Sequence, residues 1–234
     1  MLKIEHTVVF GWEAAIRGMR NPMNSWEKSD SHECLCKKNA ADDCEMVEHG
    51  HNPANACNDG KYGFCVGEND LALMQRLARS GPDHGKFLRM VNVTTDITAP
   101  LYWWKEFDTY KVGTVANSCS TMHKIADKEF ILEDFSCDRL NEKSLYMLND
   151  TIKYLNAVRE AFLYTKDKDY WWQMIQLLPS SYNQRRTVQL NYEVLRKMYF
   201  ARKDHKLDEW HTLCDWMRGL PYFPEICGGE GGKD

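Results

Sequence analysis

Residues 99–125, APLYWWKEFDTYKVGTVANSCSTMHKI, join an aromatic helix to a polar loop. Asp96 and Thr98 can cap free amides at the start of a helix, and Pro100 is tolerated in its first turn because its missing N–H costs nothing there. Gly113 is a typical helix stop. The body of the helix is apolar, through Leu101, Trp103, Trp104, Phe107 and Tyr110. This stretch therefore predicts a short buried helix followed directly by a loop.

The loop after this helix consists largely of small polar residues: Thr114, Asn117, Ser118, Cys119, Ser120 and Thr121. Such a run can bind a polar ligand through hydroxyls, amides and backbone N–H groups. It is equally typical of a solvated Ser/Thr-rich loop that binds nothing. Both interpretations stay open on the residues alone.

Length and composition limit the class of protein. A chain of 234 residues forms one large domain or two small ones, and 43% hydrophobic with 27% charged residues is ordinary for a globular protein. A net charge of −4 argues against a broad nucleic-acid surface, although a local basic pocket remains possible. No apolar run approaches the ~18 residues of a membrane span. Nine cysteines without a signal-peptide pattern predict reduced thiols in the cytoplasm.

Residues 25–69 differ from the rest of the chain, since they are polar and nearly free of aliphatic side chains. Their cysteines and histidines could form a structural zinc site. However, the Cys34-x-Cys36 and His49-x-His51 spacings are tighter than those of ordinary zinc fingers, and no CxxC occurs. We therefore expect a poorly packed surface insertion that binds no catalytic metal, and the Gly-rich residues 228–234 predict a disordered tail. The candidate ligands are Cys34, Cys36, Cys44, Cys57, Cys65, His32, His49 and His51.

The remaining periodicity predicts an α/β (α+β) fold, in which a mixed sheet is flanked by long helices within a single domain over residues 1–227. Two strands are expected, Lys3–Phe10 with Val8, Val9 and Phe10 inward, and Phe87–Thr95. Helices are expected over Glu13–Met19, from Asn69 to Gly81, over Glu142–Tyr164, over Asp169–Leu178 and over Leu207–Leu220.

The segment from Asn183 to Leu220 carries two polar residues in an otherwise apolar pattern. Val188, Asn191, Leu195, Met198 and Arg202 follow one another at steps of three and four, which predicts one helical face. A buried Asn or Arg needs a partner. The partner of Arg202 is either a structural ion pair or a ligand.

The order of these segments resembles the flavin-dependent thymidylate synthases (the ThyX family) over most of the chain, the insertion excepted. The family turn Gly-His-x-x-Pro-x-x-His resembles residues 81–89, with His84 on the first histidine. The Ala-Pro-led helix resembles the chain from Ala99 onward. The carboxy-terminal pattern Leu-Pro…Asn-x-Arg-x-Leu…Leu-Arg resembles Leu178-Pro179, residues 191–195 and Ala201-Arg202. Without this resemblance, His84 would be interpreted as a hydrogen-bonded structural residue.

The family signature Arg-His-Arg followed by x-x-Ser-x-Asn-Glu-x-Ser-x-Arg-Tyr matches less well. It falls on Thr109-Tyr110-Lys111 and continues through Thr114, Ala116, Asn117, Cys119, Thr121 and Met122. The phosphate-binding arginine becomes Thr121, and a further family arginine falls on Ile175. Neither side chain replaces the planar fork with which arginine binds phosphate. The resemblance thus supports the fold better than the chemistry.

The resemblance implies an enzyme that makes dTMP from dUMP with methylenetetrahydrofolate and NADPH, with FAD bound where the subunits of a homotetramer meet. It implies Arg202 as the catalytic residue, beside the uracil. The implied cofactor-binding residues are His84, Lys86, Thr109, Tyr110, Lys111, Asn117, Asn191 and Lys197. The implied substrate-binding residues are Glu106, Ser118, Cys119, Ser120, Thr121 and Arg202.

Two functions remain open. The first is such an enzyme, with the nucleotide preference of the family or an altered one. In this enzyme Cys119 serves either as a polar contact or as a nucleophile. The second is a ThyX-fold protein that has lost catalysis and binds a nucleotide or a protein partner. Asn191 and Arg202 favour the enzyme, whereas the replaced arginines favour the binding protein.

Overall fold

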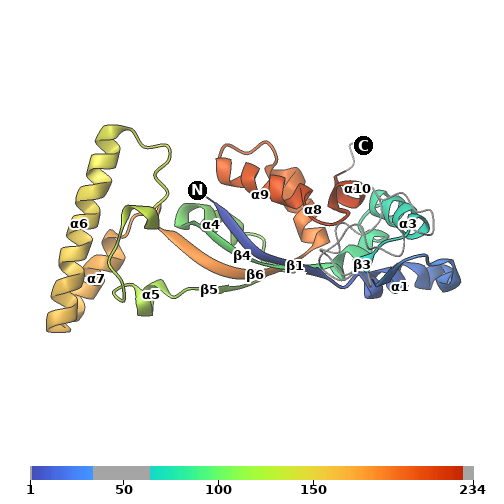
Figure 1. Ribbon diagram of the computed structural model, residues 1–234, viewed down its shortest axis with the longest axis horizontal. Helices are drawn as coiled ribbons and strands as arrows, with labels where there is room; N and C mark the ends of the chain where they lie inside the picture. Colours follow the sequence, from blue (N-terminus) through green and yellow to red (C-terminus); the bar gives the residue numbers. More distant parts are fainter. Residues whose placement is uncertain (1, 34–63, 229–234) are drawn as a thin grey trace, which may run out of the picture. The chain divides into compact units, whose positions relative to one another are not determined.

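The computed structural model describes residues 2–33 and 64–228, and the chain divides into two compact units. The first unit comprises Met1–Glu5, Asp96–Lys111 and Ala116–Val188. The second comprises His6–Thr95, Val112–Val115 and Gln189–Asp234. Figure 1 labels the helices and strands of both units.

A four-stranded sheet with the order β1-β4-β6-β5 contributes residues to both units. Its strands are β1 (Lys3–Phe10), β4 (Asn92–Pro100), β5 (Val115–Ser118) and β6 (Asn183–Asn191). The predicted α/β fold with a sheet and long helices is confirmed. No helix among the described residues is both long enough and apolar enough to cross a membrane.

The first strand has the predicted bounds but not the predicted inward face. Val9 is buried, whereas Val8 and Phe10 are 55% and 43% exposed. Successive side chains point to opposite faces of a strand, so three consecutive residues cannot all point inward. The prediction for Val8 and Phe10 was therefore wrong.

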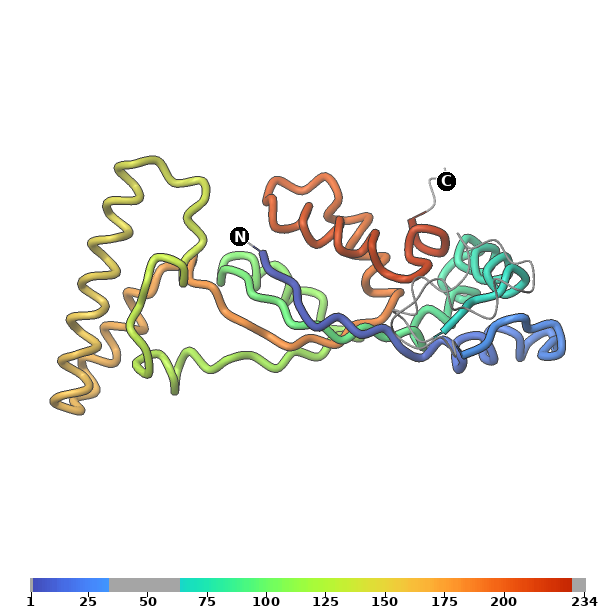
Figure 2. The backbone as a smooth tube through the Cα atoms, viewed as in Figure 1, coloured from blue at the N-terminus to red at the C-terminus, as the bar shows by residue number. Residues whose placement is uncertain are grey.

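The first unit is built around a pair of helices that run side by side (Figure 2). They are α6 (Glu142–Thr165) and α7 (Lys168–Leu177), and their start positions are capped by the side chains of Asn141 and Asp167. An apolar cluster lies between them and the preceding segment. Its buried members are Ile125, Ala126, Phe130, Phe135, Leu148, Ile152, Leu155, Val158 and Met174.

The aromatic helix of the opening stretch is α4 (Leu101–Phe107), and its Trp103, Trp104 and Phe107 are buried as predicted. Its N-cap is Pro100, which offers no side-chain hydrogen bond. The predicted caps Asp96 and Thr98 lie inside β4 instead, so that prediction was wrong. Two further short elements belong to this unit, α5 (Thr121–Lys124) and the 3₁₀ helix η5 (Leu132–Asp134).

The second unit gathers the helices from both ends of the chain around an aromatic core. Trp12 meets Tyr192 and Tyr222 edge to face at centroid distances of 5.4 and 5.5 Å, and Tyr192 meets Phe223 at 5.5 Å. The helices are α1 (Trp12–Arg20), α3 (Glu68–Arg79), α8 (Tyr192–Arg202), α9 (Asp208–Arg218) and α10 (Phe223–Cys227). The 3₁₀ helices are η1 (Asn21–Met23), η2 (Trp26–Lys28) and η4 (Gly85–Arg89).

Two predicted boundaries were wrong for physical reasons. Residues 85–89 form η4, and β4 starts only at Asn92, because the chain first turns at Gly81–Gly85. Residues 183–191 form the strand β6, which sequence reasoning missed, and the helix begins after Asn191. Val188 and Arg202 therefore do not share a helical face, since steps of three and four also arise by chance in an alternating strand.

The described ends of the insertion are exposed over most of residues 26–33, but Ser25, Cys65 and Val66 are buried, which contradicts the expected loose packing at these positions. Strand β2 (His32–Glu33) pairs with β3 (Phe64–Cys65), and Cys65 is buried. Residues 34–63 and 229–234 lie outside the described residues, and with them most of the candidate zinc ligands and the predicted disordered tail. Within the described part of the chain, no group of three His, Cys, Asp or Glu side chains could hold a metal.

Gly11 lies at the junction of β1 and α1, with φ of 95° and a close approach to residue 90. A Cβ atom there would come within 2.1 Å of the Met90 carbonyl oxygen. Gly81 has a similar φ of 97° but no heavy atom within 4 Å of its Cβ position. We expect Gly81→Ala to cost about 1 kcal/mol from backbone strain and Gly11→Ala to cost at least ~2 kcal/mol more, because a carbonyl cannot rotate away. Denaturant unfolding of both variants checks this, and equal losses would contradict it.

Candidate functional site

A cavity of about 680 Å³ lies within the second unit, between the end of α3, the turn before η4, and α8. We call it the α3–α8 cavity. Its walls include the backbone of Gly81 and Pro82 and the side chains of Glu193 and Lys197. Phe200 adds an aromatic surface and is itself 45% exposed. This volume is in the range of small-molecule sites in proteins.

Positive charge dominates the wall of this cavity. Arg79, Arg196 and Lys197 line it together with one carboxylate, that of Glu193. The Arg196 guanidinium donates from Nη1 to the Ala78 carbonyl oxygen at 2.8 Å, and this hydrogen bond holds the side chain against α3. The cavity can therefore attract an anion while offering an aromatic ring beside it.

The single acid of the cavity is neutralised locally. Arg89 donates from Nε and Nη2 to the two carboxylate oxygens of Glu193, at 2.7 and 3.1 Å. These hydrogen bonds hold the pKa of Glu193 below its ordinary value, and the charge of Lys197, whose Nζ is 3.5 Å from the carboxylate, acts in the same direction. Glu193 is thus charged at neutral pH and ties η4 to α8.

The predicted cofactor residues of this unit fall into two groups. Lys197 lines the α3–α8 cavity, and the exposed His84 belongs to the turn that closes it, where its N–H donates to the Gly81 carbonyl at 3.2 Å. Lys86 follows this turn and is exposed. Asn191 is buried and is not part of the cavity wall. Its Oδ1 accepts from the Val194 N–H at 3.0 Å, so it caps α8.

Arg202 is the last residue of α8 and is half-buried, whereas Leu195 and Met198 on the same helix are fully buried. Its guanidinium carbon lies 4.6 Å from the centroid of the Trp210 ring, on α9. A cation at this distance is attracted by the face of the ring. Arg202 therefore has an aromatic partner that neither of the two sequence-based explanations included.

The remaining predicted site residues belong to the first unit. Glu106 and Thr109 meet at the end of α4, where the Thr109 hydroxyl donates to the Glu106 carbonyl oxygen at 2.7 Å. The Tyr110 N–H donates to the Phe107 carbonyl at 3.0 Å, and Lys111 is exposed. These hydrogen bonds form the turn after α4, and the side chains of Tyr110 and Lys111 take no part in them.

The small-polar segment is partly an exposed edge strand and not only a loop. Asn117 and Ser118 end β5, all of whose residues are exposed. Cys119 is held to β6 by its backbone, since its N–H donates to Arg185 O and its carbonyl accepts from Gln184 Nε2, both at 2.9 Å. Ser120 accepts from the His123 N–H and caps α5, which Thr121 begins.

The thiol of Cys119 is exposed, and among the described residues no base hydrogen-bonds to it. Activation of a cysteine nucleophile needs such a base or a neighbouring cation within reach. The neighbouring cation Arg185 interacts electrostatically with Cys119, so both the polar-contact and the nucleophile interpretation of Cys119 stay open.

Sequence reasoning missed the cations Arg79, Arg186 and Arg196. Arg186 lies on β6, with its guanidinium carbon 4.1 Å from the Trp104 ring centroid and Nη1 2.7 Å from Asp108 Oδ1. The only signal was the Gln-Arg-Arg-Thr run within a strand that had been interpreted as part of a helical segment. Nothing in the sequence distinguishes Arg79 and Arg196 from the other cations of the chain.

Comparisons with known proteins agree with this architecture. Two crystal structures of thymidylate synthase X (ThyX) from Helicobacter pylori, both with FAD and dUMP, match the chain at TM-scores of 0.63 and 0.62. Each is 15% identical; the matches cover 97% and 96% of this chain and 97% of each neighbour. No protein-family model matches the sequence, and no curated protein matches it. At this level of identity the likeness concerns the fold, and the chain therefore has a ThyX-like fold.

Proposed function

We propose that the chain is a flavin-dependent thymidylate synthase-like enzyme that converts dUMP to dTMP with methylenetetrahydrofolate and NADPH. The ThyX-like fold over nearly the whole chain supports this proposal. The observation that carries it is the α3–α8 cavity, where cations surround an exposed aromatic ring next to the turn that bears His84.

The residues of this cavity fit part of FAD, which joins a planar aromatic system to a diphosphate. Lys197, Arg196 and Arg79 would hold phosphate, and the ring of Phe200 would pack against an aromatic face. His84 and Lys86 would contact the cofactor from the turn. When bound, FAD supplies the hydride and carries the one-carbon unit, while the chain binds and orients.

Arg202 of the second unit would contact the uracil ring of the nucleotide. The guanidinium of Arg202 is fixed by the Trp210 ring, and a fixed cation stabilises negative charge that develops on the uracil ring. The assignment of Ser118, Cys119, Ser120 and Thr121 in the first unit to the nucleotide stays a prediction from the resemblance.

Binding of FAD is the first test of this proposal. We expect the purified protein to show flavin absorbance near ~450 nm, or to bind added FAD with saturation. Lys197→Gln should weaken FAD binding about 10-fold, because it removes one charge-assisted contact. Quenching of FAD fluorescence measures both proteins.

The matched control for this test is Lys203→Gln, which follows α8 and does not line the cavity. It should bind FAD like the wild type. A protein that is free of flavin and shows no saturable FAD binding would overturn the proposal.

The second candidate is a catalytically inactive ThyX-fold protein that binds a nucleotide or a protein partner. The residue at one family arginine position, Ile175, packs against the apolar cluster of the first unit. Thr121 at the other position is half-buried at the start of α5. Neither can bind phosphate as an arginine does. Binding of dUMP with no dUMP-dependent oxidation of NADPH would favour this candidate.

Assembly as a homotetramer also stays a proposal. Its support is the outer surface of α6, where Tyr146, Met147, Tyr154 and Tyr164 are each more than half exposed. Large exposed apolar patches are typical of interfaces.

A further inference from the structure

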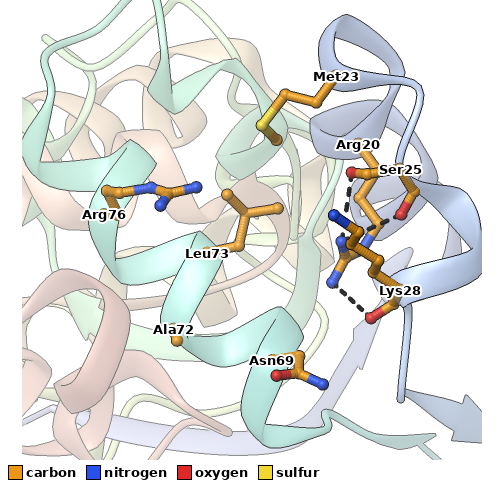
Figure 3. A pocket seen from close by; sticks show the side chains of 8 residues that line it. All are labelled: Arg20, Met23, Ser25, Lys28, Asn69, Ala72, Leu73 and Arg76. Carbon is orange, nitrogen blue, oxygen red and sulfur yellow. Dashed lines mark hydrogen bonds between the residues drawn. The ribbon is translucent and has the colours of Figure 1, made fainter.

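A second cavity, of about 470 Å³, lies within the second unit between α3 and the segment Arg20–Lys28 (Figure 3). We call it the η2–α3 cavity. In the figure the guanidinium of Arg76 on α3 points toward Leu73, and the Lys28 side chain lies on the opposite wall. Met23 and Leu73 contribute apolar surface. The cavity is of the size that small ligands occupy.

Arg20 builds one wall of this cavity, and most of its guanidinium donors are used in hydrogen bonds within the protein. It is 4% exposed, and its Nε donates to Asp70 Oδ1 at 2.6 Å. Its Nη1 and Nη2 donate to the carbonyl oxygens of Ser25 and Lys28, at 3.2 and 3.0 Å. These bonds, drawn as dashed lines in Figure 3, fix the segment that carries Lys28. The wall is therefore preorganised by a buried, satisfied ion pair.

Lys28 and Arg76 differ from Arg20 in being exposed and, within residues 2–33 and 64–228, in forming no ion pair. Asn69 also lines the cavity, and among the described residues its side-chain amide makes no hydrogen bond, while its backbone N–H donates to Asp30 Oδ2 at 2.8 Å. Two cations and the Asn69 side chain thus line one space. An anion between the cations would relieve their mutual repulsion.

We propose that the η2–α3 cavity binds a small organic phosphate, with its phosphate between Lys28 and Arg76 and its apolar body against Met23 and Leu73. A phosphate monoester carries nearly two negative charges at neutral pH, which matches two unpaired cations better than a carboxylate does. The guanidinium of Arg76 offers the planar fork that binds phosphate oxygens in pairs. The apolar wall favours an organic ester over inorganic phosphate.

The probe for this site is 1-naphthyl phosphate, titrated into the full-length protein by calorimetry with and without saturating FAD. We expect one saturable site, about 10-fold weaker in Lys28→Gln and in Arg76→Gln, since each removes one charge-assisted contact. Affinity should fall with added salt. Both side chains are exposed, and Lys28 accepts from Arg20 through its backbone, so melting curves should stay unchanged.

The matched control is Arg79→Gln, one turn further along α3 and part of the α3–α8 cavity. It should bind the probe like the wild type. The proposal would be overturned if Lys28→Gln and Arg76→Gln left probe binding unchanged while Arg79→Gln weakened it or FAD displaced the probe. It would also be overturned if no saturable binding occurred at millimolar probe. If 1-naphthoate, a carboxylate with a single negative charge, bound with the same affinity as 1-naphthyl phosphate, the preference for phosphate would be overturned. The proposal does not depend on FAD, so failure of flavin binding would leave it standing.

Discussion

Asp70→Asn is expected to destabilise the second unit by about 3–5 kcal/mol, which lowers its melting temperature by roughly 10 °C. The Asp70 side chain is fully buried and 2.6 Å from Arg20. Its Oδ2 also accepts from the hydroxyls of Ser29 and Ser31, at 2.7 and 2.6 Å. The amide leaves the Arg20 guanidinium without a counter-charge and can accept fewer of these bonds. Thermal unfolding followed by circular dichroism measures the loss.

The same carboxylate predicts a dependence of stability on pH. Burial alone would raise the pKa of Asp70, but the hydrogen bonds from Ser31, Ser29 and Arg20 together hold it below the ordinary 3.8. The ionised Asp70 therefore makes its full contribution to the free energy of unfolding when the pH is above the pKa of this residue in the unfolded chain. This contribution is lost as the pH falls through the lower pKa of the folded protein. The Asp70→Asn variant should lack this part of the acid transition.

The control for Asp70 is Glu13→Gln on α1, which breaks an exposed ion pair with Arg17. Exposed pairs contribute little, so this variant should stay within about 0.5 kcal/mol of the wild type. If Asp70→Asn melted within a degree or two of the wild type, the buried pair would not be what holds the start of the insertion to α3.

Arg202→Ala is expected to lower turnover of dUMP by about 100-fold, typical for the loss of one preorganised cation. The free protein should lose only about 1 kcal/mol, because the half-buried guanidinium gives up its contact with the Trp210 ring. Lysine should rescue poorly, since a point charge lacks the planar fork. The measurement combines dTMP formation with melting curves recorded with and without dUMP.

Lys203→Ala serves as the control here, because Lys203 is the exposed neighbour that follows α8. It should change neither turnover nor the stabilisation by dUMP. If Arg202→Ala instead lowered the melting temperature of the free protein by several degrees and kept the full stabilisation by dUMP, Arg202 would be a structural residue that packs α8 against α9.

Several elements could be predicted because the forces that form them are local. The bounds of β1 and α6, and the buried aromatic face of α4, follow from apolar periodicity and from capping residues such as Asn141. The ThyX-like architecture also followed from the order of segments, since a few spaced motifs such as Leu178-Pro179 and Asn191 are enough to align a fold.

Other features depended on contacts between residues far apart in sequence. Asn191 looked like one member of a helical face, but the neighbouring strands of the sheet impose β6 on the residues before it and leave Asn191 as the cap of α8. The insertion looked loose, but its described start is held by Asp70, 41 residues beyond Ser29. Hydrophobic periodicity depends on residues that are close together in the sequence, so it contains no information about partners that are distant in the sequence.

The candidate sites show the same division most clearly. The sequence alone determined which residue types are available, and its resemblance to the ThyX family singled out Lys197, His84 and Arg202. Only the tertiary structure decided that Arg79 and Arg196 share a cavity with Lys197, that Arg202 lies against Trp210, and that Lys28 and Arg76 line one cavity. The physical reason is that a binding site is a property of charges and surfaces brought together by packing, and packing joins segments that can lie far apart in the sequence, as Arg79 and Lys197 do.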